Sequence, residues 1–544
     1  MARTTILLAS LLTLPLLAAP LRAQLPLLHG KDGAAPGDRL GSAVSDAGDV
    51  NGDGFADFII GSPGEDAPGL DSGAAHVYSG KDGALIFTIA GEAAGDQLGY
   101  SVASAGDVDR DGRADVIVGA PFSDHRRTDG GLALVYSGAG GSVIHGFDGD
   151  SSGSLFGWAV GGAGDVDADG HDDLIVGAPF DTIRITFSGS ARVFSGRDGR
   201  VIHTFEGTQV EDFFGVSVDG AGDVDGDAFD DVIVGCNQLA RGGAGYVRVF
   251  SGQNGSILLS ASGDSGGDLF GSSVSGAGDG DGDRVPDFMV GAPGVGFRPG
   301  FARLFSGRGN PLFTFAGAAS GDSFGVSVGG AGDVNGDGFP DVIAGATGSD
   351  VAGPNFGGAS VFCGLTGALL LEFHGAGASD HFGGSVSGAG DSNGDGFLDV
   401  IVGAYSDQPH GADSGSARVL AVCGTRIYGE GLGGQQTLTL EWLPGSLPFA
   451  NPGTLTIAGG TPLSPGLLAV SLASDDRTIA GAPILIDLGF FFYVPVQFDA
   501  AGITSILVDL RQPPFAGTTL FSQAFLLSAR ILHSSNGLEI LLCQ

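Results

Sequence analysis

Residues 156–179 read FGWAVGGAGDVDADGHDDLIVGAP, and this stretch decides the fold because it recurs along the chain. Its acidic part has the form Asp-x-Asp/Asn-x-Asp-x-x-x-Asp. Seven copies of that pattern occur, and successive copies begin 54 to 58 residues apart. They start at Asp49, Asp107, Asp165, Asp223, Asp279, Asp333 and Asp391. A repeat of this length is typical of proteins that multiply one supersecondary unit.

Each unit has the same internal order. A short apolar strand follows a Phe-Gly or Leu-Gly step, and an Ala-Gly-Asp step leads into the acidic loop. A Val- and Ile-rich strand then ends in Gly-Ala-Pro or a variant. Two further strands follow, joined by a turn such as Arg197-Asp198-Gly199. Four antiparallel strands in each of seven units, with no helical period, predict an all-β, seven-bladed β-propeller over residues 24–425.

The N-terminal end of the repeat predicts how the ring closes. The segment Leu25–Gly30 aligns with the last strand of a unit, because a Gly-Asp-x-Leu-Gly pattern follows it, as it does at Gly95. We therefore expect this segment to pair with the last blade, which removes exposed sheet edges.

The acidic loops have the composition of cation sites. In the first copy, the side-chain oxygens of Asp49, Asn51 and Asp53 alternate along the chain, the carbonyl of Phe55 can add another, and Asp57 ends the loop. Ca²⁺ takes about six to eight oxygen ligands, whereas Mg²⁺ tends to keep its waters, so Ca²⁺ is the favoured cation. The alternative is a solvated Asp- and Gly-rich turn. Seven copies in register favour metal binding over that alternative.

The same five positions predict ligands for up to seven Ca²⁺ ions, the seventh residue of each loop contributing its carbonyl. Ala228 and Arg284 replace the turn glycine, at a cost of about 1 kcal/mol if φ is positive there. The sites at 223–231 and 279–287 are therefore expected to be weaker. The predicted ligands are Asp49, Asn51, Asp53, Phe55 and Asp57; Asp107, Asp109, Asp111, Arg113 and Asp115; Asp165, Asp167, Asp169, His171 and Asp173; Asp223, Asp225, Asp227, Phe229 and Asp231; Asp279, Asp281, Asp283, Val285 and Asp287; Asp333, Asn335, Asp337, Phe339 and Asp341; Asp391, Asn393, Asp395, Phe397 and Asp399.

The loops also explain the composition. The chain of 544 residues has 62 acidic and 24 basic residues, for a net charge of −38, and 102 glycines. The predicted ligand positions account for 25 of the aspartates. A chain this acidic does not bind nucleic acid through a basic surface, and the absence of a Gly-X-Y period excludes collagen.

The Phe-Gly, acidic-loop and Gly-Ala-Pro signatures together resemble the FG-GAP repeat, the family of the integrin α-subunit propeller. The resemblance covers roughly residues 27–424. It implies a seven-bladed propeller with Ca²⁺ in the acidic loops, and it favours a role in extracellular adhesion.

The regions outside the repeat predict export and a second domain. Residues 1–23 have the basic start, apolar core and final alanine of a signal peptide, so the protein is expected to be secreted or at the cell surface, and no later apolar run is long enough to span a membrane. Residues 426–544 alternate short strand candidates with Pro and Gly turns and predict a β-sandwich-like domain. This domain resembles those appended to secreted bacterial proteins, which favours a bacterial source. Cys423 and Cys543 bracket this region, and the sequence leaves open whether they form a disulfide.

Three function classes remain open on the sequence alone. The first is an extracellular binding or adhesion module that meets a protein or a glycan; the others are a propeller-based lectin or carbohydrate-active enzyme, and a structural envelope component. No catalytic constellation stands out, since the G-x-S-x-G match at 325–329 lies within a predicted strand. Irregular loops at 124–129, 182–188, 294–300 and 349–357 are the expected partner contacts.

Overall fold

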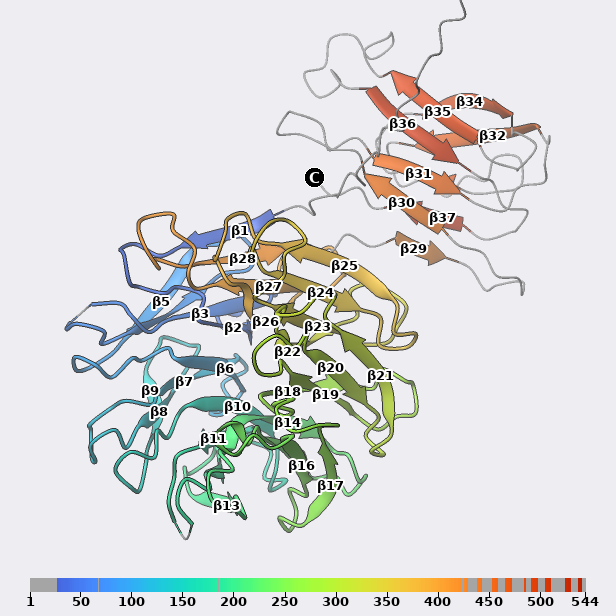
Figure 1. Cartoon of the computed structure of the whole chain (residues 1–544). Helices are drawn as coiled ribbons and strands as arrows, with labels where there is room; N and C mark the ends of the chain where they lie inside the picture. The colour runs from blue at the N-terminus through green and yellow to red at the C-terminus, as the bar shows by residue number, and fades with distance from the viewer. Residues whose placement is uncertain are drawn as a thin grey trace, which may run out of the picture. The chain divides into compact units, whose positions relative to one another are not determined.

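The computed structural model describes residues 27–66, 68–183 and 185–421, together with the backbone of strands between Thr425 and Ile540. Seven four-stranded antiparallel sheets follow one another around a ring (Figure 1), which confirms the predicted propeller. All of them lie in one compact unit, Leu25–Thr425.

In blades one to six the four strands run outward in chain order from the centre of the ring, and in blade seven the N-terminal strand takes the outermost place. The inner strands are β2 (Ala43–Gly48), β6 (Ser101–Gly106), β10 (Ala159–Gly164), β14 (Phe214–Gly222), β18 (Ser273–Gly278), β22 (Phe324–Gly332) and β26 (Phe382–Gly390). The second strands are β3 (Asp57–Ser62), β7 (Asp115–Ala120), β11 (Asp173–Ala178), β15 (Asp231–Cys236), β19 (Asp287–Ala292), β23 (Asp341–Ala346) and β27 (Asp399–Ala404).

The two outer positions complete each blade. The third strands are β4 (Ala74–Tyr78), β8 (Leu132–Tyr136), β12 (Ser190–Phe194), β16 (Tyr246–Phe250), β20 (Phe301–Phe305), β24 (Gly358–Phe362) and β28 (Ser416–Leu420). The fourth strands are β5 (Leu85–Ala90), β9 (Val143–Asp148), β13 (Val201–Glu206), β17 (Ile257–Ser262), β21 (Pro311–Ala316), β25 (Leu369–His374) and, in the last blade, β1 (Leu27–Asp32).

Burial explains the strand compositions. Every residue of the second strands is buried, because each second strand is covered on both faces by neighbouring blades. This position therefore reads as an uninterrupted Val and Ile run. The fourth strands form the rim, and their first residues are exposed, as at Leu85 and Val143.

The N-terminal strand closes the ring as the sequence predicts, and it is described from Leu27, since residues 25 and 26 lie outside the described residues. β1 pairs antiparallel with β28, placing Gly30 opposite Arg418. Two of its side chains also reach the first blade, where His29 Nε2 lies 2.5 Å from the Gly80 carbonyl oxygen and Lys31 Nζ donates to the Gly83 carbonyl at 2.5 Å. The N-terminal strand thus joins the last blade through backbone hydrogen bonds and the first blade through side chains.

The C-terminal region is described only as backbone strands. The strands are β29 (Thr425–Tyr428), β30 (Leu438–Trp442), β31 (Gly453–Ile457), β32 (Pro465–Ser471), β33 (Ile484–Leu485), β34 (Phe491–Gln497), β35 (Thr504–Asp509), β36 (Ala524–Ala529) and β37 (Gly537–Ile540). Their assembly into a sandwich stays a prediction. Cys423, Cys543 and residues 1–23 lie outside the described residues.

Helical structure is confined to one short element in the part of the chain that the structure describes, the 3₁₀ turn Leu239–Arg241. No described helix has the length and apolarity to cross a bilayer.

Candidate metal centre

The acidic loops all lie on one face of the propeller. Each connects an inner strand to a second strand, so antiparallel pairing puts the seven loops at the same end of their blades. Adjacent loops are linked around the ring. For example, the backbone N–H of Asp165 donates to Asp230 Oδ2 of the next loop at 2.9 Å, and that of Asp107 donates to Asp172 Oδ2 at 2.7 Å.

Two positions of every loop are left-handed. The sixth residue has φ between 70° and 89°, which includes 71° at Ala228 and 70° at Arg284. The positive φ that makes a non-glycine costly there is therefore confirmed. The fourth residue is left-handed too, at 61° in Arg110 and 55° in Ala168. Loops two and three thus carry the same kind of strain, and backbone conformation alone does not single out loops four and five.

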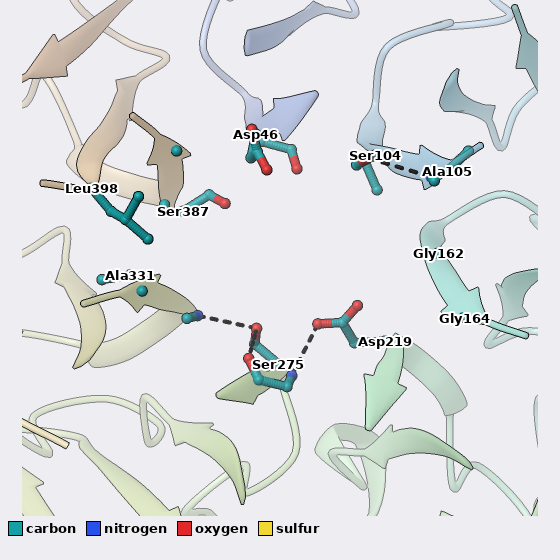
Figure 2. Close-up of a pocket in the computed structure, with 18 of the residues that line it drawn as sticks. Asp46, Ser104, Ala105, Gly162, Gly164, Asp219, Ser275, Ala331, Ser387 and Leu398 are labelled. Carbon is teal, nitrogen blue, oxygen red and sulfur yellow. Dashed lines mark hydrogen bonds between the residues drawn. The ribbon is translucent and has the colours of Figure 1, made fainter. Parts of the chain in front are cut away.

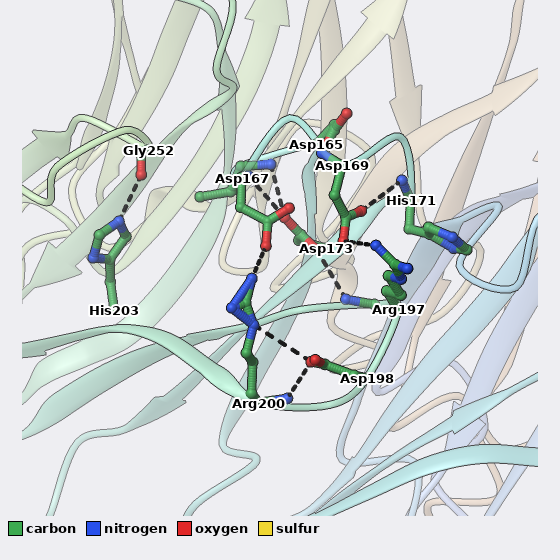
Figure 3. Close-up of polar contacts among 12 residues, drawn as sticks. Asp165, Asp167, Asp169, His171, Asp173, Arg197, Asp198, Arg200, His203 and Gly252 are labelled. Atoms are coloured by element: carbon green, nitrogen blue, oxygen red, sulfur yellow. Dashed lines mark hydrogen bonds and ion pairs between the residues drawn. The ribbon is translucent and has the colours of Figure 1, made fainter.

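The third loop shows how the aspartates organise the turn (Figure 3). The first carboxylate, Asp165, accepts the backbone N–H of Asp169 at Oδ1 and of Gly170 at Oδ2, both at 2.9 Å. Asp169 Oδ1 accepts the N–H of His171 at 3.1 Å. The His171 ring turns to the preceding blade, with Nδ1 2.7 Å from the Val108 carbonyl oxygen. The carboxylates therefore fold the loop even before any cation is considered.

The ninth aspartate is a buried anchor. Asp173 has no exposed surface, and its Oδ2 accepts the N–H groups of Val166 and Asp167 at 2.8 and 3.2 Å. Its Oδ1 accepts the N–H of Gly196, at the end of the third strand, at 2.9 Å. Asp57 binds Val50, Asn51 and Gly80 in the same way. The ninth position thus fixes the loop to the third strand of its own blade, a role that spacing alone did not reveal.

Burial changes the protonation of these anchors. Removal from water raises the pKa to about 6 in Asp57 and Asp115, while Asp173 reaches about 7. Burial also raises the pKa of the anchors of the later loops. The pKa is about 6 for Asp231 and Asp287 and about 7 for Asp341. Hydrogen bonds from backbone N–H groups oppose the shift but do not outweigh it.

Without metal, the protein is expected to become more stable as the pH falls from about 8 to about 5. An unfolded Asp has a pKa near ~4, so the raised folded-state values mean that the folded state binds more protons between these limits. This contribution is complete below the unfolded pKa and is lost as the pH rises through 6 to 7. Calorimetric melting in chelator measures it, and excess Ca²⁺ should flatten the profile. A melting temperature that rises with pH in chelator would contradict the expectation.

The carboxylates converge on common points. In loops two to five, one carboxylate oxygen from each of the first, third and ninth positions lies within 4.8 Å of the others. The structure thus brings these predicted ligands together in loops four and five as well as in two and three. In loop six, Asp337 and Asp341 converge with Cys363 instead. These sets are Asp107, Asp109 and Asp115; Asp165, Asp167 and Asp173; Asp223, Asp225 and Asp231; Asp279, Asp281 and Asp287.

Asparagine at the third position behaves differently from aspartate. In loops one and six, the side-chain amides of Asn51 and Asn335 donate to the ninth carboxylate at 3.3 Å. Asn335 Oδ1 accepts the N–H of Asp337 at 2.8 Å. These loops therefore relieve repulsion between carboxylates with an amide where the others have a third negative charge. The predicted carbonyl ligands at the seventh position stay a prediction.

Buried carboxylate oxygens without a hydrogen-bond partner indicate whether the loops suit a cation. Among the described residues, the buried side-chain atoms without a hydrogen-bond partner include Asp167 Oδ1 in loop three and Asp279 Oδ1 in loop five. Native proteins leave few buried polar atoms unpaired. Converging carboxylates with an oxygen left over match the hard, oxygen-rich coordination that Ca²⁺ requires. The residues present therefore fit a divalent cation.

Basic side chains from the turn between the third and fourth strands already contact some loops. In loop three, the Arg200 guanidinium bonds to Asp167 and Arg197 lies 3.9 Å from Asp169. In loop five, Arg308 Nε lies 2.7 Å from Asp283 Oδ2. These side chains are more than half exposed, so a cation can displace them at low cost.

A second candidate site is the central channel, a cavity of about 510 Å³ lined by the inner strands (Figure 2). Its wall is mostly glycine, alanine and serine, and the carboxylates of Asp46 and Asp219 project into it. Asp219 accepts the N–H groups of Gly220 and Gly276 at 3.0 and 3.1 Å, and desolvation raises its pKa to about 6. The sequence pattern did not identify this pair, because each aspartate occurs in one blade only. At the same positions the other blades have glycine, serine or alanine.

Comparisons with known proteins agree with the fold. The FG-GAP repeat model matches residues 43–78, 98–136, 156–201 and 324–362. Similar proteins include integrin alpha-V of Gallus gallus, 31% identical over 209 residues that make up 36% of this chain and 20% of that protein. Integrin alpha-5 of Xenopus laevis is 33% identical over 209 residues, 35% of this chain and 19% of that protein. Integrin alpha-7 of Mus musculus is 36% identical over 159 residues, 27% of this chain and 13% of that protein.

The chain thus spans about a fifth or less of the length of these integrin α relatives. The matched segments coincide with blades that the structure shows, each with its inner strand, acidic loop and second strand. The ring of seven blades in residues 25–425 is therefore an integrin α-like β-propeller built from FG-GAP repeats.

Proposed function

We propose that this protein is an extracellular binding module of the adhesion type, whose acidic loops take up to seven Ca²⁺ ions as structural ligands. The observation that carries the metal part is the convergence of carboxylates in four loops, two of which also hold a buried carboxylate oxygen without a partner. The proposal includes export through residues 1–23 and a separate domain at 426–544. Loops two and four are the strongest sites, because their carboxylates converge and no described basic side chain pairs with them.

The surface for a partner is the face opposite the acidic loops. The loops between second and third strands lie there, and they expose large apolar side chains. Phe297 is 89% exposed and Leu70 is 70% exposed, in blades five and one. Phe187 and Val351 add further apolar tips in blades three and six. Three of these four residues fall within the loops predicted as partner contacts. Exposed apolar side chains on several loops of one face are typical of protein-binding surfaces.

A glycan is the second candidate ligand, because aromatic rings gather asymmetrically on blades two to four. The ring of Trp158 lies 4.7 Å from that of Tyr100 and 5.9 Å from that of Phe180, and Phe180 lies 5.0 Å from Phe213. All are partly exposed. The position of Trp158 holds no aromatic residue in blades one and four to seven. The equivalent residues there are Ser42, Val216, Ser272, Val326 and Gly384.

The two ligands are separated by probing one array of extracellular matrix proteins and glycans with the labelled full chain in Ca²⁺. Phe297→Ser is expected to weaken protein binding about tenfold and to leave glycan binding unchanged. Trp158→Ala should do the reverse if the ligand is a glycan. Binding that survives both substitutions would contradict this assignment of the surface. Cleavage of arrayed glycans that is lost in Asp219→Asn would overturn a role in binding alone.

A further inference from the structure

A buried residue directly follows the third strand in each of blades one to six. It directly precedes the glycine whose N–H binds the ninth carboxylate, as Ser195 precedes Gly196 and Cys363 precedes Gly364. This residue is a serine in five described blades and a cysteine in the sixth, and it is buried in all of them. The set is Ser79, Ser137, Ser195, Ser251, Ser306 and Cys363, with exposed fractions of 6, 4, 0, 0, 3 and 3%.

The cysteine shows where this position points. Cys363 Sγ lies 3.4 Å from Asp337 Oδ2, and one carboxylate oxygen of Asp341 lies within 4.8 Å of both groups. Gly364 N–H reaches Asp341 Oδ1 at 3.1 Å, and Gly196 N–H reaches Asp173 Oδ1 at 2.9 Å. Because the backbone anchor is the same in blade three, we expect Ser195 to face its loop as Cys363 does. Ser137 and Ser306 instead accept a turn N–H, from Ala139 and Arg308, each at 3.3 Å.

The serines supply an independent sign that a ligand belongs there. Ser195 and Ser251 have no exposed surface, and their Oγ atoms have no hydrogen-bond partner. In blade three, Asp167 Oδ1 is a second buried oxygen without a partner. An unpaired buried polar group costs about 1–3 kcal/mol, so each of these oxygens calls for a partner such as a bound cation.

We propose that the residue directly after the third strand is an additional metal ligand where its side chain faces the loop, and that Cys363 makes the sixth loop a mixed carboxylate and thiolate site for a thiophilic divalent cation such as Zn²⁺. The inference deepens the proposed function, since it rests on the acidic loops holding cations. Thiolate sulfur selects Zn²⁺ and similar ions, whereas Ca²⁺ takes oxygen alone. On binding, the Cys363 S–H bond breaks, the proton passes to solvent, and a sulfur–metal bond forms while Asp337 and Asp341 supply oxygens.

The test uses Co²⁺ as a spectroscopic substitute for Zn²⁺ in the metal-stripped full chain. A thiolate bound to Co²⁺ gives a charge-transfer absorption that carboxylates do not. The band is expected to saturate at one Co²⁺ per chain, to be displaced by Zn²⁺ and to resist excess Ca²⁺. Cys363→Ser should abolish it without unfolding the blade, because serine occupies this position in five other blades.

Two matched variants assign the sulfur. Cys236→Ser removes the other buried free thiol, whose Sγ donates to the Asp212 carbonyl oxygen at 2.9 Å, and should leave the band intact. The equivalent position in blade seven is Ala421, which follows Leu420 directly, so Cys423→Ser removes a cysteine two residues beyond it and should also leave the band intact. A band that persists in Cys363→Ser, or no band in the unsubstituted chain, would overturn the proposal.

The same preparation distinguishes this inference from the proposed function. If Ca²⁺ fails to raise the melting temperature while the Co²⁺ band follows Cys363, the calcium role falls and the thiolate site stands. If Ca²⁺ stabilises the chain and the band is absent, the thiolate site falls alone.

Discussion

Asp173→Ala is expected to lower the free energy of unfolding by about 2–6 kcal/mol, because it leaves two N–H groups without an acceptor at about 1–3 kcal/mol each. These are the groups of Asp167 and Gly196, both bonded to a carboxylate with no exposed surface. The Val166 N–H loses one of two acceptors and keeps the Gly164 carbonyl at 3.2 Å. The loss should appear in chelator as well as in Ca²⁺, since the anchor works without a cation. Denaturant unfolding monitored in both buffers measures it.

Asp198→Ala is the matched control for that experiment. Asp198 lies in the exposed turn of the same blade and contacts only the neighbouring Arg200. Its removal should change the stability by less than about 0.5 kcal/mol. If Asp173→Ala were as mild as this control in chelator, the ninth position would be a metal ligand only, and the anchor described above would be wrong.

Deletion of residues 27–32 is expected to open the ring. β28 would lose the five residue pairs that it forms with β1, and blade one would lose its contacts with His29 and Lys31. At about 1 kcal/mol net per hydrogen bond, the loss is on the order of 5 kcal/mol. The bared edge of β28 should also promote association of chains. Thermal unfolding and light scattering measure the two effects.

Leu27→Ser tests the same strand without breaking its backbone ladder. The Leu27 side chain is 53% exposed, so the substitution should be nearly neutral. A deletion variant that stays monomeric and melts with the unsubstituted chain would show that ring closure through β1 contributes little.

The repeat made the fold predictable because the local signals agreed in every copy. The Phe-Gly steps, the acidic turns and the buried Val and Ile runs each specify one part of a blade, and seven repetitions leave little room for another architecture. Even the pairing of the N-terminal strand with β28 followed from alignment of Leu25–Gly30 with a fourth strand.

The site was only partly predictable for a physical reason. Spacing within the loop identifies residues that are close in sequence, and the structure brings most of those carboxylates together. Spacing within the loop does not identify groups that come from another strand. Gly196 N–H, Arg200 and Cys363 all come from the third strand or its following turn. The left-handed fourth position was also missed, since Arg110 and Ala168 give no glycine signal there.

Thermal unfolding of the full chain in Ca²⁺ and in chelator tests the central claim most directly, namely that the acidic loops hold cations that stabilise the propeller. Ca²⁺ should be added well above the 10⁻⁴–10⁻³ M expected, roughly, of extracellular sites. A site filled at about 100 times its Kd adds about 2.7 kcal/mol of stability, so several such sites should raise the melting temperature by many degrees. A melting temperature that is the same in Ca²⁺ and in chelator at neutral pH would contradict the claim.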